Sequence, residues 1–416
     1  MADGPATEPY GREGLPLDQA RALILEQLQP LAASESLALS HALGRTTAAA
    51  VIAPAAVPGF RASVMDGYAI AGSDPPPLGC SWRLVGVSAA GAPYGPVLRT
   101  GEAVRILTGA VVPEGSDRVL PQELVAVDGD RLELLEPGGA NAWIRQPTEE
   151  AAAGQELVPA GQRLGVADLG RLASCGVQQL QVTRRPRIGL LISGDELLPP
   201  GVARGPGQIW ESNSVLLSAL LQRLGYAVAD QRVVVDQPEP LRLALRELAA
   251  GCDVVVSTGG VSAGDSDWIR PLVAELGQVS FWKLFLKPGR PFAWGQVAGV
   301  PFFGLPGNPV AAAITALQLL WPALQRLEGA EIQLLPRLKV RLEAALRRGA
   351  GRPELARARL VVAADGGLWA RVEGSQASSR IGSLQGADLL LEIPAELGAL
   401  EAGTELWAQL LRLPVL

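Results

Sequence analysis

Between residues 184 and 330 the sequence alternates short apolar runs with amphipathic helical segments, and this rhythm constrains the fold more than any other feature. The strand-like runs lie at 188–192, 227–235, 253–257, 279–286 and 292–294, and the helical patterns at 213–224, 241–250, 268–276 and 310–327. Strands that alternate with helices predict a parallel, doubly wound sheet with helices on both faces. Such a sheet binds its ligand at the carboxyl ends of its strands, so we expect a binding site there.

The rest of the chain predicts three further domains around this α/β domain. Helical patterns at 17–28, 37–44 and 166–174 indicate a linker domain, whereas the other segments are short, alternating and separated by Pro/Gly turns, as in small β domains. The expected limits are 13–52 with 148–183 for the helical linker domain, 53–147 for an inserted β-rich domain, 184–330 for the α/β domain and 331–416 for a carboxyl-terminal β-barrel. The fold class is therefore multidomain α/β and β.

Composition excludes several classes of protein. The chain has 416 residues, of which 48% are hydrophobic and 19% charged, so it is too apolar to be disordered. It has neither an uninterrupted apolar run of membrane-spanning length nor a signal-peptide pattern, and we expect a cytoplasmic protein with no membrane contact. A net charge of -6 opposes nucleic-acid binding. Cys80, Cys175 and Cys252 lack disulfide or zinc spacing, and a single histidine, His41, excludes a multi-histidine metal site.

The segment STGGVSAGDSDW, residues 257–268, leaves a predicted strand through two glycines. Gly259 and Gly260 let backbone N–H groups approach an anion at the start of the next helix. Asp265 and Asp267 would repel that anion unless a divalent cation lies between them. The segment thus predicts a phosphate site with Mg²⁺, while the alternative is that Asp267 only caps the helix.

Two further loops follow strands of the same domain. GLPGNP, residues 304–309, forms a Gly/Pro turn before a helix, and LLISGDELLPPG, residues 190–201, carries two acidic side chains. A single Gly/Pro turn is a weak signal, but loops at one edge of a sheet support each other.

Lysine is rare in this chain, with three lysines among 36 basic residues. Lys283 and Lys287 lie four residues apart in the segment WKLFLKPGR. A rotatable ammonium meets anions differently from a planar guanidinium, so this segment is a place where lysine itself matters. Chance survival of the two lysines stays equally open from this count.

The ordered motifs MDGYA, RILTGA with PEG, SGDEL, GQI-x-x-SN, STGGVS-x-GD-x-D, FWKL-x-x-KPG-x-P and GLPGNP, across residues 58–309, resemble the MoeA family of molybdopterin molybdenumtransferases, which includes the E domain of gephyrin. The resemblance implies a molybdopterin-binding α/β domain in a homodimer, with the active site between the α/β domain of one subunit and the inserted domain of the other. It also implies Mg²⁺-dependent insertion of molybdate into adenylylated molybdopterin, with release of AMP.

The resemblance assigns roles to individual residues. It implies that the catalytic residues are Asp66, Thr108, Glu123, Glu150, Lys283 and Lys287. The implied molybdopterin-binding residues are Ser193, Gly194, Asp195, Glu196, Asn213, Gly259, Gly260, Val261, Ser262, Pro306, Gly307 and Asn308, and the implied metal ligands are Glu211, Asp265 and Asp267. Glu150 and Glu211 stand where the family usually has aspartate, and Arg61 and Ala62 replace a usual Asp-Asn pair, so the reach of these groups differs from the family pattern.

Two other functions compete with this interpretation. A non-catalytic molybdopterin-binding or scaffold protein of gephyrin type is one, but the retained Asp66, Lys283 and Lys287 favour catalysis. A molybdopterin adenylyltransferase is the other, but that enzyme resembles the α/β domain alone. The expected partners are a molybdopterin adenylyltransferase and molybdoenzyme maturation factors.

Overall fold

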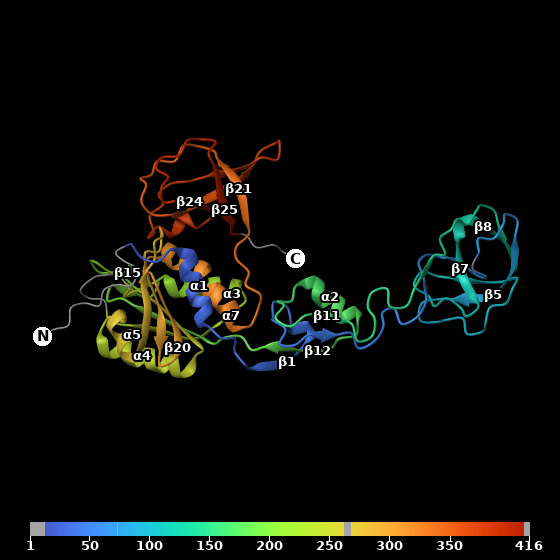
Figure 1. The fold of residues 1–416 in the computed structure, drawn as a ribbon, viewed down its shortest axis with the longest axis horizontal. Coiled ribbons are helices and arrows are strands. Elements are labelled where there is room, and N and C mark those ends of the chain that lie inside the picture. The colour runs from blue at the N-terminus through green and yellow to red at the C-terminus, as the bar shows by residue number, and fades with distance from the viewer. Residues whose placement is uncertain (1–12, 73, 262–267, 412–416) are drawn as a thin grey trace.

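A computed structural model describes residues 13–72, 74–261 and 268–411, and shows an elongated molecule (Figure 1). A unit built on a mixed sheet, here the α/β unit, lies at one end beside a β-barrel. A second six-stranded sheet, the distal unit, lies at the other end, and a small linker unit containing helix α2 (Val166–Ser174) lies between them. The multidomain α/β and β architecture is confirmed.

The sheet of the α/β unit has the strand order β16-β13-β17-β20-β19-β18. Its strands are β13 (Ile188–Ser193), β16 (Val228–Val234), β17 (Val254–Thr258), β18 (Gly277–Lys283), β19 (Pro291–Val297) and β20 (Val300–Leu305). The first four strands in this order are parallel, whereas β19 runs antiparallel to both of its neighbours. The expectation of a wholly parallel sheet fails at this edge, because Ala298 and Gly299, both with positive φ, join β19 to β20 in a tight hairpin.

Helices cover both faces of this sheet, as predicted. The helices are α1 (Leu17–Gln27), α3 (Asn213–Arg223), α4 (Pro238–Gly251), α5 (Ile269–Leu276), α6 (Pro309–Thr315) and α7 (Trp321–Leu327). Leu190 of β13 packs in the core with α1, α3, α6 and α7, and the next residue, Leu191, packs with α4 and α5. This alternation is the period of two expected for a strand buried on both faces.

Helices α6 and α7 are continuous through a π-helical turn at Ala316–Leu320. Residues 309–327 are long and apolar enough to cross a membrane by length and composition, yet 89% of this span is buried inside the fold. That degree of burial is typical of a core helix.

The linker unit pairs distant parts of the chain. Strand β1 (Ser34–Ala38) pairs with β12 (Gln179–Thr183), and β2 (Val51–Ile52) pairs with β11 (Glu156–Val158). The helix predicted over 37–44 is wrong, because β1 is followed only by a 3₁₀ turn at Leu39–His41. Leucines two residues apart fit a strand as well as a helix, and the partner strand supplies the ladder hydrogen bonds.

The distal unit and the barrel are both β-rich, as predicted. The distal sheet has the order β7-β4-β6-β5-β9-β8, with β4 (Gly67–Ala71), β5 (Ser81–Ser88), β6 (Glu102–Ile106), β7 (Ser116–Pro121), β8 (Val125–Asp128) and β9 (Arg131–Leu134), and β3 (Ala62–Ser63) pairs with β10 (Ile144–Arg145). The barrel is closed by β21 (Arg337–Leu342), β22 (Glu354–Val362), β23 (Leu368–Arg371), β24 (Leu389–Ile393) and β25 (Glu405–Leu410).

Two chain passes connect the linker unit to the distal unit, and we call this crossing the neck. Val57 N donates to Ala151 O over 2.8 Å, and Ala151 N donates to Val57 O over 3.1 Å. The outgoing and returning passes are therefore held together as a pair.

A buried ionic cluster connects the linker unit to the α/β unit. The Glu328 side chain is 0% exposed and accepts hydrogen bonds from Arg163 Nη2 (2.7 Å), Tyr226 Oη (3.0 Å) and Thr46 Oγ1 (3.3 Å). Arg185 Nε lies 3.7 Å from the second carboxylate oxygen. Burial and the nearby Glu328 charge raise the pKa of Tyr226, so the phenol stays protonated and its O–H donates the hydrogen bond to Glu328. The cluster ties the two units through groups that have little access to water.

Candidate active site

Three loops at the carboxyl ends of β13, β17 and β20 lie at one edge of the α/β sheet, and Asn213 joins two of them. Asn213 Nδ2 donates to Thr258 Oγ1 and to Gly307 O, each over 2.7 Å. Thr258 Oγ1 in turn donates to Pro306 O over 3.1 Å. The structure therefore brings the end of β17, the GLPGNP loop and the start of α3 together, at the edge where a doubly wound sheet binds its ligand.

Glycine at position 259 is required by the close approach of the β13 loop. Gly259 has a φ of 91°, and a Cβ atom there would lie 2.4 Å from Ser193 O. A Cβ on Gly307 would lie 3.5 Å from Gly259 Cα, so the third loop is also close. Gly260 follows with a φ of 60°. Glycine backbone at a strand end allows an anion to come near the peptide N–H groups.

Several buried polar atoms near this edge have no hydrogen-bond partner among the described residues, and two of them belong to predicted binding residues. These two are Ser193 Oγ and Asn213 Oδ1, in side chains that are 6% and 8% exposed. Most buried polar groups in folded proteins have a partner, because an unmade hydrogen bond is costly. A polar ligand that enters between the loops is therefore a suitable partner for both atoms.

Acidic groups flank the same edge. Asp236 N donates to Asp195 Oδ1 over 3.0 Å, and burial raises the pKa of Asp236, with a further contribution from the Asp195 and Glu196 charges. Asp236 Oδ1 is buried and has no partner within the described chain. No three His, Cys, Asp or Glu side chains in the described part are grouped closely enough to hold a metal by themselves.

Glu211, predicted as a metal ligand, caps helix α3. Its two carboxylate oxygens accept hydrogen bonds from Ser214 N (2.8 Å) and from the Ser214 hydroxyl. The residue is 7% exposed and lies next to the short parallel pair β14 (Leu197–Leu198) and β15 (Ile209–Trp210). An acidic group at a helix N-terminus is stabilised by the exposed N–H groups there, so these contacts give Glu211 a structural role.

Of four other predicted site residues, the structure describes only one. Ser262, Asp265 and Asp267 lie outside the described residues. Val261 is 2% exposed and packs in the core with α4 and α5, so its side chain does not face a ligand.

The barrel contributes two groups that the sequence reasoning missed. Lys287 Nζ lies 3.0 Å from Glu354 Oε1 of β22, and Asn308 Nδ2 donates to Ser378 Oγ over 3.0 Å. Lys287 is half-exposed, whereas Glu354 is 5% exposed, so the carboxylate orients the ammonium. Lys283 ends β18 and is half-buried. Sequence carries little signal for Glu354 and Ser378, because both come from a domain far along the chain.

A second group of predicted residues lies in the distal unit. Asp66 Oδ1 accepts hydrogen bonds from Thr108 N and Thr108 Oγ1, each over 2.8 Å. These bonds, with a smaller contribution from Arg105, lower the pKa of Asp66, so the carboxylate stays ionised. Gln122 N donates to Asp66 O over 3.2 Å, which brings the exposed 3₁₀ turn of Glu123 (Gln122–Leu124) to the same loop.

The predicted catalytic residues thus lie in three places within one chain. Asp66, Thr108 and Glu123 lie in the distal unit, at the opposite end of the molecule from the α/β unit that carries Lys283 and Lys287 (Figure 1). Glu150 lies at the neck, where its carboxylate meets Arg171 Nε over 3.1 Å. One subunit by itself does not bring the two principal groups together.

Three family profiles match successive parts of the chain. Family profiles described as the MoeA N-terminal region (domain I and II), a probable molybdopterin binding domain and the MoeA C-terminal region (domain IV) match residues 15–176, 189–326 and 339–411. A molybdopterin molybdenumtransferase from Haemophilus influenzae is 34% identical over 391 residues, which cover 94% of this chain and 96% of the relative. The chain belongs to the MoeA family.

Other members of the MoeA family are also similar to the chain. Gephyrin from Dictyostelium discoideum is 30% identical over 94% of this chain and 61% of its own length. The crystal structure of a molybdopterin biosynthesis MoeA protein from Pyrococcus horikoshii superposes with a TM-score of 0.78 at 27% identity, covering 96% of this chain and 99% of that one. The expected membership of this family is confirmed.

Proposed function

We propose that this MoeA-family chain is a molybdopterin molybdenumtransferase, which inserts molybdate into adenylylated molybdopterin and releases AMP. The observation that carries the proposal is the meeting of strand-end loops at Asn213, with two buried polar atoms available to a ligand. Relatives that are named molybdopterin molybdenumtransferase, at 34% and 32% identity, support the same activity.

The α/β unit binds the molybdopterin substrate in this proposal. The backbone of Gly259 and Gly260 receives the phosphate groups, while Ser193 Oγ and Asn213 Oδ1 bind polar atoms of the pterin part. Ser262 and Gly194 remain proposed contacts of the same loops. Asp195, Glu196, Pro306 and Asn308 complete the proposed set.

Molybdate binds next to this substrate, at the lysines. Lys287 meets the oxyanion as a point charge, held by Glu354 at 3.0 Å so that its position does not depend on a flexible side chain alone. Lys283 belongs to the same proposed group. Hydrogen bonds from an ammonium to an oxyanion are about twice as strong as those between neutral groups.

The donor set at this edge fits Mg²⁺. Magnesium is bound in many enzymes by one or two carboxylates together with substrate phosphates, so a closed protein cage is not required. Asp195 and Asp236 offer hard oxygen donors, and Asp236 Oδ1 has no partner among described residues. We propose that these two, together with Asp265 and Asp267, hold the ion. When bound, Mg²⁺ neutralises charge on the phosphoryl oxygens.

We further propose a homodimer in which the distal unit of one subunit completes the site of the other. The long separation of Asp66 from the α/β unit within one chain supports this arrangement. Because its pKa is lowered, Asp66 stays ionised and acts as a hydrogen-bond acceptor and not as a general acid. Glu123, Thr108 and Glu150 line or support the same wall. The domain limits, the cytoplasmic location and the two partner enzymes remain predictions.

The proposal is tested by incubating the purified protein with adenylylated molybdopterin, molybdate and Mg²⁺. We expect AMP to appear and an apo-molybdoenzyme to become active when the product is added. The matched control is Asp66→Asn, which keeps the acceptor oxygen for Thr108 but removes the charge. Binding of molybdopterin without any release of AMP would favour the non-catalytic scaffold alternative instead.

A further inference from the structure

The barrel touches the proposed site at two points only a few residues from the strand-end loops. One is the Lys287–Glu354 pair, and the other is the hydrogen bond from Asn308 to Ser378. Backbone hydrogen bonds support both, with Lys287 N donating to Pro353 O over 2.9 Å and Val310 N donating to Ser378 O over 3.1 Å. Two points define an axis, so these contacts alone leave the barrel free to rotate about it.

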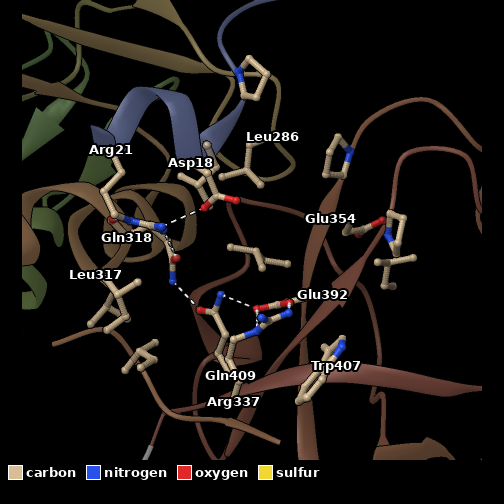
Figure 2. A pocket seen from close by; sticks show the side chains of 18 of the residues that line it. Asp18, Arg21, Leu286, Leu317, Gln318, Arg337, Glu354, Glu392, Trp407 and Gln409 are labelled. Atoms are coloured by element: carbon tan, nitrogen blue, oxygen red, sulfur yellow. Dashed lines mark hydrogen bonds and ion pairs between the residues drawn. The ribbon is translucent and has the colours of Figure 1, made fainter. Parts of the chain in front are cut away.

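A third connection lies away from these loops, beside the cavity shown in Figure 2. Gln318 Nε2 donates to Gln409 Oε1 over 2.6 Å, and Gln409 Nε2 donates to Glu392 Oε1 over 2.8 Å. Arg21 fixes Gln318 from the α/β side by donating to its backbone O (3.0 Å) and its Oε1 (3.2 Å). Arg337 Nε fixes Glu392 from the barrel side over 3.0 Å. We call the pair Gln318–Gln409 the latch.

Apolar packing crosses part of this junction, where Leu355 and Leu390 of the barrel share a core with Leu319 of the π-helical turn, and the latch lies beside an unfilled part of it. The adjacent cavity has a volume of about 480 Å³ and is lined by α1, the π-helical turn and the barrel strands β21, β22, β24 and β25. Atoms that line a cavity lose contacts across it, so packing contributes less on the side of the junction where the cavity lies. Gln318 and Gln409 are only 4% and 9% exposed, and hydrogen bonds between buried groups are directional and costly to break. The latch therefore adds a directional restraint on the orientation of the barrel where packing is incomplete.

Both ends of the latch lead directly to the proposed site. Gln318 lies in the helix that begins at Pro309, directly after Asn308, and it sits in the π-helical turn, a local departure from regular helix that often marks functional positions. On the barrel side, Glu392 of β24 is paired with Leu355 of β22, the residue next to Glu354. A rotation about the axis that breaks the latch keeps the two contact points in place but changes the angle at which the Glu354 carboxylate meets Lys287 Nζ.

We propose that Gln318 and Gln409 are positioning residues that hold the barrel so that Glu354 and Ser378 stay aligned with the oxyanion side of the site. For its kinetic consequence the inference rests on the proposed function. The latch touches no substrate in this arrangement, and it acts through Lys287 and Asn308.

The kinetic test compares Gln318→Ala and Gln409→Ala with Gln325→Ala. Gln325 is a matched control, because it lies on the same continuous helix, is 1% exposed and exchanges two hydrogen bonds (2.9 and 2.8 Å) with the backbone of Gln333, which precedes the first barrel strand, and none with a barrel strand among the described residues. We expect the latch variants to raise the KM for molybdate about tenfold, the size of one lost charge-assisted hydrogen bond, with the Kd for molybdopterin unchanged. The double latch variant should be no worse than either single one. Equal kinetics in latch and control variants would overturn the proposal.

A second measurement is independent of activity. Spin labels at Leu243 of α4 and Val362 of β22, which are 58% and 63% exposed, report the distance between the α/β unit and the barrel. The background carries Cys80→Ser, and labelled subunits are diluted with unlabelled ones. We expect a broader distance distribution in both latch variants than in wild type and Gln325→Ala. An unchanged distribution refutes the latch, whereas wild-type protein that releases no AMP refutes the proposed function alone.

Discussion

The proposed composite site predicts that two inactive variants restore each other. Asp66→Ala removes the acceptor carboxylate of the distal unit, and Lys287→Ala removes an ammonium at the edge of the α/β unit. In a two-fold dimer each cleft then takes one wall from each subunit. A mixed dimer has one cleft in which both walls are intact and one cleft in which both are damaged, while each pure variant dimer has two damaged clefts.

The magnitude follows from this geometry. With equal amounts and free exchange of subunits, half of the dimers are mixed and each holds one good cleft of two, so recovery reaches about a quarter of wild-type activity. Activity should peak at equal amounts and fall symmetrically as either variant is in excess. The assay measures AMP release after the two proteins are mixed, and native mass spectrometry of one isotopically labelled variant verifies exchange.

If exchange is complete and activity stays at the level of the single variants, Asp66 and Lys287 do not act in one cleft built across the dimer. Full activity of either single variant would instead remove that residue from the catalytic set.

Three further predictions concern substitutions of individual side chains or of the lysine pair. Because Thr108 lowers the pKa of Asp66, Thr108→Val should raise that pKa and shift the acid limb of the pH–rate profile to higher pH, and an unshifted limb contradicts this role. Replacing both Lys283 and Lys287 by alanine should weaken molybdate or molybdopterin binding about tenfold or more, as measured by calorimetry. Glu328→Ala should lower the free energy of unfolding by about 3 kcal/mol in urea, because it leaves the partly buried Arg163 and Arg185 charges and the Tyr226 hydroxyl without their partner, and a loss below about 1 kcal/mol would refute this reasoning.

Local patterns in the sequence predicted the elements whose stability is local. Helix α2 begins and ends at the predicted residues 166 and 174, and the strands and helices of the α/β unit lie where apolar periodicity places them. The helix predicted over 37–44 was wrong because β1 pairs with β12, a segment far away in the chain. Local periodicity carries no information about such a partner. The prediction of a wholly parallel sheet was wrong at β19 for a related reason. The turn at Ala298 and Gly299 indicates a hairpin, but the general alternation of strands and helices outweighed it in the prediction.

The candidate site shows the same limit. The strand-end loops were predictable, because topology alone brings the ends of parallel strands to one edge. Their partners in the barrel were not predictable, because Glu354 and Ser378 come near these loops only when the barrel packs against the α/β unit. Glu328 is a comparable case, a buried carboxylate whose arginine and tyrosine partners come from three separate segments.

The neck makes the distal unit an exchangeable cassette. Val57 and Ala151 face each other as an antiparallel pair, so the two ends of the inserted segment lie about 5 Å apart and the remaining chain can be rejoined across them with little disturbance. Adding one residue to each pass of the paired neck would extend the reach of the unit by about 3.3 Å. The spacing between the two walls of the proposed dimeric cleft can therefore be changed through a short ribbon of backbone, while every loop proposed to hold substrate keeps its sequence.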